Sequence, residues 1–339
     1  SCSPYRFSRR ILSTPRSMIR EILKVTERPD IISFAGGLPS PAFLDTAGVA
    51  KAAEQVLSED GCAALQYATS EGYMPLREWI AGRYRKRFGL SIDPEEILIT
   101  HGSQQTLDIL GRIFINEGDP VMIEAPGYLG AIQAFSQYMP HFHAIPLGEE
   151  GPNPSRLAGA LESTHPVFSY CIPNSQNPSG ISYSTWCREE LAGLYEDSGT
   201  LLIEDDAYGE IRFTSEKRPS FGSLLPREDV ALLGSFSKIV APGIRLGWLC
   251  ANREIIDQAV TAKQASDLHS NILCQRILCR YLGENDIDLH ISRIIEAYRM
   301  QCTHMLRLMD DLFPEEVSYS RPDGGMFIWL TLPKKFSAM

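Results

Sequence analysis

Six short apolar runs constrain the fold of this chain more than any other feature. Each run ends in a polar residue or a glycine-rich turn, and a segment with helical periodicity follows. Such an alternation of strands and helices is typical of parallel βαβ units. The runs are Ile97–Thr100, Val121–Glu124, Val167–Ile172, Leu201–Asp205, Val230–Gly234 and Leu246–Cys250. They predict an α/β fold that is built around a mainly parallel sheet.

The residues that follow these runs are candidate site residues, because ligands of such sheets bind beyond the carboxyl ends of the strands. The first run leads through His101 and Gly102 into a helix whose free N–H groups could hold a phosphate. After the third run, the turn formers of Pro173–Gly180 would fix Asn177 at the strand end, since Pro178 restricts it to extended geometry. Ordinary loop punctuation remains the alternative for both segments.

The fourth run ends in three consecutive carboxylates. Side chains alternate between the two faces of a strand, so Asp205 should point away from Glu204 and Asp206. We therefore expect only one of the three carboxylates to be buried. A solvated acidic strand end is the alternative interpretation.

Lys238 directly follows the small hydroxyl residue Ser237 in the segment Ser235–Trp248, and Arg245 follows seven positions later in an apolar run. A lysine is nucleophilic only when it is deprotonated, and both burial and a nearby positive charge lower its pKa. Lys238 is therefore a candidate Schiff-base lysine. The motif alone would favour a surface lysine in a turn, because short motifs have many false matches.

Further segments follow one another in a characteristic order: Ser33–Pro39, Leu65–Tyr67 with Glu71–Arg77, Gly102–Gln105, Glu124–Tyr128, Pro173–Gly180 and Asp205–Tyr208. Together with the lysine segment they resemble the pyridoxal 5′-phosphate (PLP) aminotransferases of fold type I, class I/II. The similarity runs from about Arg16 to Pro333. Within the family, the chain is most similar to 2-aminoadipate and kynurenine aminotransferases and to the aminotransferase-like domain of MocR regulators.

The resemblance implies a fold type I PLP-transferase with two domains. Its large domain would contain a mainly parallel, seven-stranded sheet flanked by helices, and its smaller domain would be α+β. We assign residues 1–45 to an N-terminal arm and linker, residues 46–270 to the large PLP-binding domain, and residues 271–339 to the small domain, which is apparently incomplete.

The resemblance also assigns catalytic roles to Lys238, Asp205 and Tyr208. Lys238 would bind PLP as a Schiff base and then move the proton between the substrate Cα and C4′ of the cofactor. Asp205 would pair with the pyridinium nitrogen and keep it protonated, so that the ring accepts electrons. Asn177 and Tyr208 would hydrogen-bond the phenolic oxygen, and Tyr128 would stack on the ring.

The cofactor phosphate would be held by four groups, Ser103, Gln104, Ser235 and Arg245, the last through a charge-assisted contact. Tyr67 matches a family position that reaches the phosphate from the neighbouring subunit. The resemblance therefore implies a homodimer with shared active sites.

Substrate contacts are assigned to Arg20, Gly37 and Asn177. Arg20 matches an arginine that faces the substrate side chain in the 2-aminoadipate-like members, and its guanidinium suits a carboxylate or an aromatic ring. A solvated helix arginine is the alternative. Gly36 and Gly37 would let the backbone approach the substrate closely.

One family feature has no counterpart in the sequence. Family members grip the substrate α-carboxylate with an arginine well beyond the strand that Gly324–Trp329 matches. No arginine of this chain, which runs from Ser1 to Met339, can be assigned that role. We expect the sequence to belong to a longer protein.

Composition argues against several other classes. A net charge of −10 argues against nucleic-acid binding, which needs a basic face. No apolar run is long enough to predict a membrane span. The eight cysteines form no C-x-x-C pair, which predicts reduced thiols and a cytoplasmic location. His141 and His143 flank Phe142 on an expected strand edge, and we predict no metal site there or elsewhere.

The sequence thus predicts a PLP-dependent aminotransferase. It would move the amino group of an L-amino acid, of the 2-aminoadipate, glutamate, aromatic or branched-chain type, to a 2-oxo acid such as 2-oxoglutarate by a ping-pong mechanism. The alternatives are the PLP-binding effector domain of a MocR-type regulator, and a PLP lyase or decarboxylase.

Overall fold

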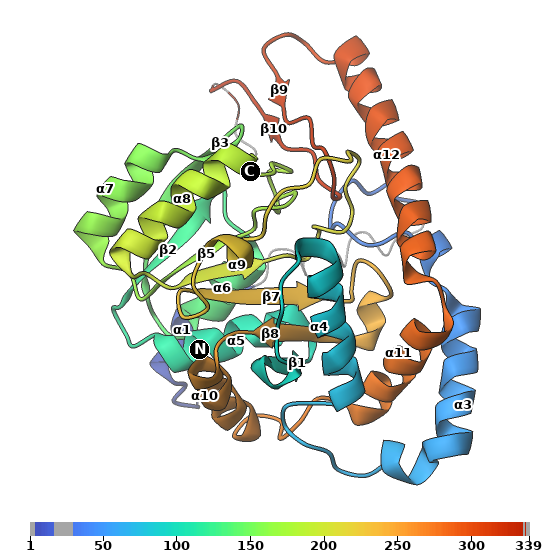
Figure 1. Ribbon diagram of the computed structural model, residues 1–339. Helices are drawn as coiled ribbons and strands as arrows, with labels where there is room; N and C mark the ends of the chain where they lie inside the picture. Colours follow the sequence, from blue (N-terminus) through green and yellow to red (C-terminus); the bar gives the residue numbers. More distant parts are fainter. Residues whose placement is uncertain (1–3, 17–29, 335, 337–339) are drawn as a thin grey trace.

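The computed structural model describes residues 4–16, 30–334 and 336, and a mixed β-sheet lies at its centre (Figure 1). The strand order is β1-β8-β7-β6-β5-β2-β3-β4. The strands are β1 (Ile97–Thr100), β2 (Pro120–Ala125), β3 (His141–Gly148), β4 (Gly151–Pro152), β5 (Phe168–Cys171), β6 (Leu202–Asp205), β7 (Val230–Ser235) and β8 (Gly247–Cys250). Each of the six predicted runs forms a strand.

The prediction of a mainly parallel sheet is confirmed. Strands β3, β2, β5, β6 and β7 pair in parallel, whereas β8 runs antiparallel to both β1 and β7. The predicted number of seven strands is wrong by one, because the two-residue strand β4 pairs with the end of β3. Gly151 and Pro152 carry no apolar run, so periodicity could not reveal this strand.

Helices cover both faces of the sheet. On β6, Leu202 joins one apolar cluster and Ile203 joins the other; on β7, Leu232 and Leu233 divide in the same way. The first cluster includes residues of α4, α7, α8 and α11, and the second includes residues of α5, α6 and α10. The result is a three-layer α/β/α arrangement that leaves the strand ends free to form a site.

The helices vary from a single turn to seven turns. They are α1 (Arg9–Ser13), α3 (Thr46–Ala64), α4 (Met74–Phe88), α5 (Gly102–Phe114), α6 (Leu129–Ser136), α7 (Pro154–Thr164), α8 (Thr185–Ser198), α9 (Phe221–Leu224), α10 (Arg253–Gln264), α11 (Ile272–Glu284) and α12 (Ile287–Leu312), with the 3₁₀ turns η1 (Pro41–Phe43), η2 (Pro94–Glu96) and η3 (Pro242–Ile244). Among the described residues, no helix is both long enough and apolar enough to cross a membrane.

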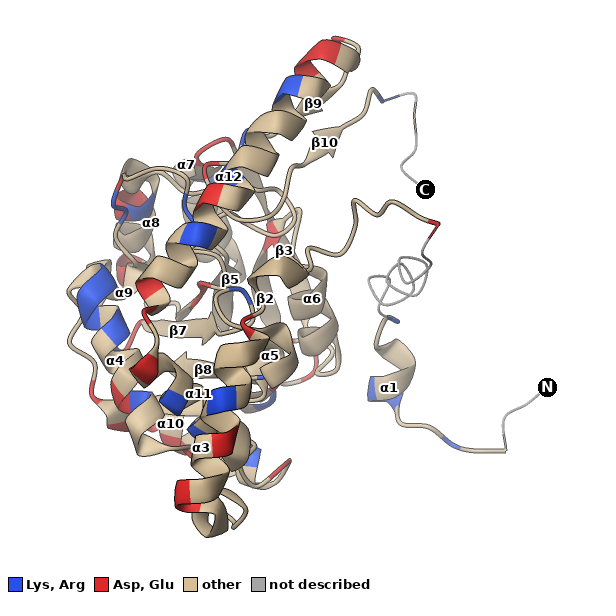
Figure 2. Ribbon diagram, turned by 90° about the vertical axis from the view of Figure 1, so that its right-hand side faces the viewer, with Lys and Arg blue, Asp and Glu red and all other residues tan. Residues whose placement is uncertain are grey.

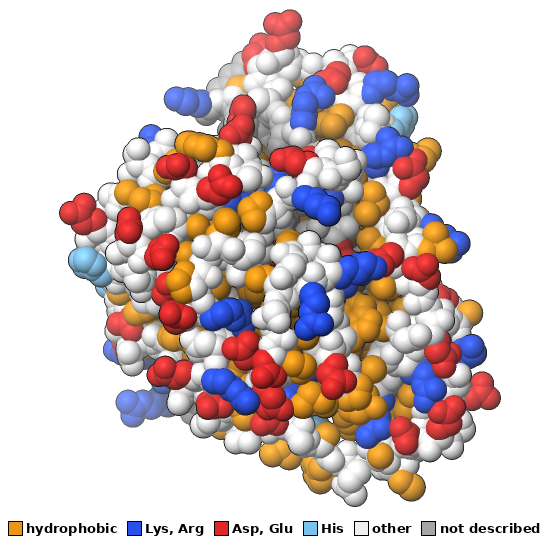
Figure 3. Space-filling view, viewed as in Figure 1, with side chains coloured by type: hydrophobic (Ala, Val, Ile, Leu, Met, Phe, Trp, Pro, Cys, Tyr) orange, Lys and Arg blue, Asp and Glu red, His pale blue; other side chains and the backbone are white. Residues whose placement is uncertain are grey.

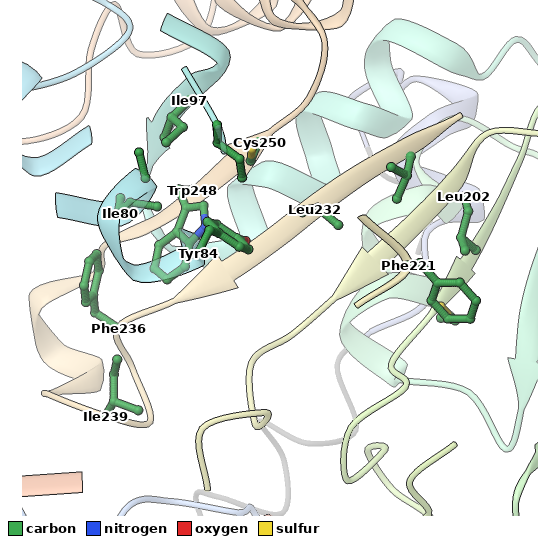
Figure 4. Close-up of a cluster of buried hydrophobic side chains, with 14 of the residues drawn as sticks. Ile80, Tyr84, Ile97, Leu202, Phe221, Leu232, Phe236, Ile239, Trp248 and Cys250 are labelled. Carbon is green, nitrogen blue, oxygen red and sulfur yellow. The ribbon is translucent and has the colours of Figure 1, made fainter. Parts of the chain in front are cut away.

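An aromatic cluster fixes the loop that follows β7 (Figure 4). Phe236 is fully buried, and its ring centroid lies 4.9 Å from that of Trp248, whose indole N–H donates to the Tyr84 hydroxyl at 3.0 Å. A Cβ atom at Gly234 would lie 2.0 Å from the Trp248 ring, so this position requires glycine. Burial of the Phe236 ring contributes about 1.5–3 kcal/mol and anchors the backbone two residues before Lys238.

Charged residues are spread over the helices and loops (Figure 2), and some of them form ion pairs between separate elements. Arg83 of α4 forms ion pairs with Glu210, on the loop after β6, and with Asp288 at the start of α12. Arg87 pairs with Asp206 at 2.9 Å. On the face shown in Figure 3, basic and acidic side chains are interspersed rather than gathered by sign.

The C-terminal part follows the long helix α12. Its second sheet consists of β9 (Ser318–Tyr319) paired antiparallel with β10 (Leu330–Thr331). The segment Gly324–Trp329, which matches a strand of the family, precedes β10, and regular pairing with β9 is confined to β10. The Gly325 N–H instead donates to the Ile211 carbonyl at 2.7 Å, which ties this segment to the loop after β6. The predicted domain boundary at residue 270 stays a prediction.

Candidate active site

The carboxyl ends of β2, β5, β6 and β7 carry most of the predicted site residues. The residues in question lie at or directly after the last strand position: Tyr128, Asn177, Asp205, Tyr208, Ser235 and Lys238. Because the four strands run in the same direction, their ends lie at one edge of the sheet. The fold therefore gathers residues that are more than 100 positions apart in the sequence.

Asp205, the last residue of β6, is buried. The Tyr170 hydroxyl on neighbouring β5 donates to its Oδ2 at 2.8 Å, whereas Oδ1 is buried and has no partner among the described residues. Burial is the main reason that the pKa of Asp205 rises to about 6. A buried acceptor without a partner is costly. This carboxylate is thus ready to accept a hydrogen bond from a protonated ring nitrogen.

The expectation that only one of the three neighbouring carboxylates is buried is wrong. Glu204 is as buried as Asp205; it accepts a hydrogen bond from the Ser220 hydroxyl at 2.7 Å, and burial raises its pKa to about 7. Asp206 accepts from Asn174 at 2.7 Å in addition to its ion pair with α4. The physical reason is that helices cover both faces of β6, so alternation leads to two buried environments.

Lys238 lies on the loop after β7, partly buried. Its Nζ donates to the Gly37 carbonyl at 3.2 Å and lies 5.6 Å from the centre of the Tyr208 ring. Burial, and then the positive charge of Arg245, lower the pKa of Lys238 to about 8. These are the two causes that the sequence predicted, and together they make deprotonation accessible near neutral pH.

The glycine that accepts from Lys238 has a restricted environment. Gly37 has φ +54°, and a Cβ atom there would lie 2.6 Å from the ring of Phe327. Both observations require glycine at this position. Gly37 and Phe327 also line a cavity of about 590 Å³ between the 33–40 loop, the 322–330 segment and α12.

Asn177 and Tyr208 lie together: the Asn177 side-chain amide donates to the Tyr208 hydroxyl at 3.4 Å. Tyr208 is buried, and burial raises its pKa far above the usual range. Tyr128 precedes α6 in the same neighbourhood; burial and the charge of Asp205 raise its pKa to about 12. All three groups therefore stay neutral and act as hydrogen-bond or stacking partners.

The first turn of α5 and Arg245 form the opposite side of the site. A Cβ atom at Gly102, which has φ +72°, would lie 2.7 Å from the Arg245 guanidinium, and one at Gly247 would lie 2.7 Å from the Ser103 N–H. Glycine thus permits a close approach that brings a cation to the N-terminus of a helix, which is an anion-binding arrangement.

Two of the expected phosphate ligands already have partners: the Gln104 amide donates to the Gly130 carbonyl at 2.8 Å, and the Ser235 hydroxyl accepts from the Ser237 N–H at 3.1 Å.

Two predicted site residues are not part of the cluster at the strand ends. Tyr67 is 79% exposed, and its ring packs against His269 with centroids 5.9 Å apart, on a separate hollow that α3, α4 and α11 border. Its predicted reach into a neighbouring subunit stays a prediction. Arg20 lies outside the described residues.

Sequence reasoning missed Tyr170, which holds Asp205. A signal was present, since Tyr170 lies in a predicted strand and its hydroxyl needs a partner when buried. Its neighbour could be recognised only once β5 was known to lie beside β6. No cluster of three or more potential metal ligands is present in the described part of the chain.

Comparisons with known proteins identify the family of this chain. Residues 31–339 match the family model "Aminotransferase class I and II". A 2-aminoadipate transaminase from Thermus thermophilus is 43% identical over 95% of this chain and 80% of the relative, and an aromatic-amino-acid aminotransferase from Thermococcus litoralis is 39% identical over 97% and 80%.

A solved structure also superposes closely on this chain. It is the α-aminoadipate aminotransferase LysN from Thermus thermophilus in complex with N-(5′-phosphopyridoxyl)-L-leucine, and it superposes with a TM-score of 0.91 at 41% identity over 98% of this chain and 83% of that one. The match of family model, close relatives and fold shows that this chain belongs to the class I and II aminotransferases.

Proposed function

We propose that the protein is a PLP-dependent aminotransferase that moves the amino group of an L-amino acid to a 2-oxo acid in two half-reactions. The observation that carries this proposal is the buried, half-satisfied Asp205 at the end of β6, together with a lysine of lowered pKa on the loop after the adjacent strand β7. Bound PLP would supply an electron sink that stabilises negative charge at the substrate α-carbon.

The residues at the strand ends fit the cofactor ring. Asp205 Oδ1 would accept from the ring N–H and keep that nitrogen protonated, because an ion pair stabilises both charges. Tyr170 holds the other carboxylate oxygen and thereby fixes the orientation of the group. Asn177 and Tyr208 would bind the phenolic oxygen, and Tyr128 would cover one ring face.

The anion-binding side fits the cofactor phosphate. Backbone N–H groups of the first turn of α5, with Ser103, Gln104 and Ser235, would donate to it, and Arg245 would add a charge-assisted bond. Lys238 Nζ, whose pKa of about 8 makes its neutral form accessible near neutral pH, would take the proton from the substrate α-carbon and deliver it to C4′ of the cofactor.

We propose a broad donor range that includes 2-aminoadipate, glutamate, and aromatic or branched-chain amino acids, with 2-oxoglutarate as an acceptor and ping-pong kinetics. The names of the relatives support the first and third classes, and the leucine adduct in the related structure supports the last. Arg20, Gly37 and Asn177 are the proposed substrate contacts on this chain.

We also propose a homodimer in which Tyr67 completes the phosphate site of the partner. The exposed Tyr67 ring is consistent with this role. Light scattering on the purified protein should give twice the chain mass, and a monomer that turns over at full rate would contradict the shared site. A cytoplasmic location remains a prediction from the cysteine pattern.

The test of the activity is the visible absorption spectrum of the purified protein before and after addition of L-2-aminoadipate or L-glutamate without an oxo acid. We expect the band of lysine-bound cofactor to be replaced by that of the aminated cofactor, and 2-oxoglutarate to restore it. A band that no amino acid changes would contradict the proposal and favour a regulatory domain. Ammonia or carbon dioxide as the product would favour a lyase or decarboxylase.

A further inference from the structure

A fully buried carboxylate, Glu124, lies at the end of β2 and has no role in the reaction described above. It is 4% exposed, and burial raises its pKa to about 7. Its Oε1 accepts from the Ile172 N–H at 3.1 Å and from the Tyr183 hydroxyl, and its Oε2 accepts from the Gln176 side-chain amide at 3.0 Å. Three donors thus converge on one carboxylate in the interior.

Gln176, its partner, is fully buried and uses every hydrogen-bonding atom of its amide group. Its Nε2 donates to the Pro126 carbonyl at 2.7 Å as well as to Glu124, and its Oε1 accepts from the Ser179 N–H at 2.8 Å. Reversal of the amide would place its carbonyl oxygen against two other acceptors. The network therefore permits one orientation of this side chain.

Glu124 and Gln176 connect two loops, and each loop carries a different proposed contact with the cofactor ring. Pro126 lies two residues before Tyr128, which would cover the ring face. Gln176 immediately precedes Asn177, which would bind the phenolic oxygen. Glu124 is also continuous with the first of these turns. Loss of the bond between Glu124 and Gln176 would leave the bond from Gln176 to the Pro126 carbonyl and so weaken the link between the two loops.

We propose that Glu124 and Gln176 form a buried positioning pair that fixes the Tyr128 turn and the Asn177 loop relative to one another, and so sets the orientation of the bound cofactor ring. This inference rests on the proposed binding of PLP. Neither residue touches the reacting atoms; both act through Tyr128 and Asn177.

Glu124→Gln should weaken the pair, because an amide NH2 replaces one of the two oxygens that accept from Gln176 and from the Ile172 N–H, so one of these two donors must face another donor. We expect faster release of PLP, by about 10–100-fold, in line with the loss of a hydrogen bond to a charged group. We also expect a weaker visible circular-dichroism band of the bound cofactor, since that band reports the asymmetry of the ring environment. Gln176→Met removes the bond to Glu124 together with those to the Pro126 carbonyl and the Ser179 N–H, and it serves if the first variant does not fold.

The exchanged variant Glu124→Gln/Gln176→Glu gives the sharper test. It restores a donor opposite an acceptor between the two positions, although the new carboxylate at position 176 must then face the Pro126 carbonyl. We expect at least a tenfold recovery of the release rate relative to Glu124→Gln, and partial recovery of the circular-dichroism band. Gln176→Glu alone, with two carboxylates face to face, should be the most impaired.

Tyr195→Phe is the matched control for a lost interior hydrogen bond. The hydroxyl of Tyr195, on α8, is 2.8 Å from that of Ser169 on β5, and it makes no other hydrogen bond among the described residues. We expect this control to lower the melting temperature and to leave the cofactor band and its release rate unchanged. Equal cofactor changes in the control, or wild-type behaviour of Glu124→Gln and Gln176→Met, would overturn the positioning role. A wild-type protein that binds no PLP would instead overturn the proposed function on which this inference rests.

Discussion

The ring side and the phosphate side of the site differ in how many of their hydrogen-bond partners the protein itself supplies. On the ring side, Asp205 is buried and held by Tyr170, while Asn177 and Tyr208 bond to each other. On the phosphate side, Arg245 is exposed, and its guanidinium donates to the Pro242 carbonyl at 3.3 Å. The ring side is a continuation of the core, whereas the phosphate side gains its main partner only when an anion binds.

Because of this difference, substitutions on the two sides should change different measured quantities. Preorganised groups in the interior act through orientation and electrostatics, so their loss should affect the reaction rate. A solvent-exposed cation contributes mainly to the free energy of ligand binding, and it changes the free energy of unfolding little. Substitutions on the ring side should therefore change turnover and stability, and those on the phosphate side should change affinity for the cofactor.

The largest effect is expected for Lys238→Ala, at the junction of the two sides. A positioned proton-transfer group contributes about 10²–10⁴-fold to a rate, so we expect transamination to fall by at least this factor. Borohydride should no longer trap PLP covalently. The exposed Lys217→Ala is the control and should keep full capture; a Lys238→Ala protein that still traps PLP would contradict the assigned role.

Asp205→Asn should reduce kcat by about 10²–10³-fold, the loss expected for one preorganised electrostatic group. It should also change the stability of the cofactor-free protein. Because the folded-state pKa of Asp205 is about 6, above its usual 3.8, the folded form retains a proton that the unfolded chain has lost between these values. The stability contribution of Asp205 is therefore present below about pH 4 and is lost as pH rises through 6.

The cofactor-free Asp205→Asn variant should consequently be more stable than the wild type at pH 8, by on the order of 2 kcal/mol. At pH 4 the difference should be small. Urea unfolding at the two pH values measures this. A variant that loses both activity and stability at pH 8 would show that Asp205 is not held in the costly, half-satisfied state seen in its contacts.

Arg245→Gln tests the phosphate side. Loss of a charge-assisted bond should weaken PLP binding about 10–100-fold, while the stability of the cofactor-free protein should change by less than about 0.5 kcal/mol. Fluorescence titration with PLP and urea unfolding measure the two quantities. Arg253→Gln, another exposed arginine, should leave PLP affinity unchanged. Destabilisation of cofactor-free Arg245→Gln by several kcal/mol would erase the distinction between the two sides.

The sequence predicted best those features that depend on contiguous residues. The apolar runs identified six strands, and the family resemblance assigned Tyr208 and Lys238 to one site, where Lys238 Nζ lies 5.6 Å from the centre of the Tyr208 ring. What it could not supply depends on pairing between distant segments. Tyr170 and Asp205 meet because β5 lies beside β6, and the bond between Glu124 and Gln176 exists because two loops close on each other.

Burial was harder to predict than strand position. Glu204 was expected to be solvated if Asp205 was buried, yet the second helical layer covers it. The sequence showed the alternation of β6 but not that both of its faces would be covered. Likewise, β4 forms by pairing with an existing edge strand, with no apolar signal of its own.

The smallest predicted effect concerns the pH dependence that Lys238 gives to the cofactor-free protein. Its folded-state pKa of about 8 lies below its usual 10.5, so between these values the unfolded chain holds a proton that the folded protein has released. Stability should therefore rise with pH across this window, by about 1–2 kcal/mol. Lys238→Met should abolish that rise, whereas Lys217→Met should retain it; urea unfolding at pH 7 and pH 10 measures both. An identical pH response of the wild type and Lys238→Met would mean that Lys238 is not desolvated in the cofactor-free protein. Lys238 would then resemble the phosphate side, which a ligand completes, and not the preformed ring side.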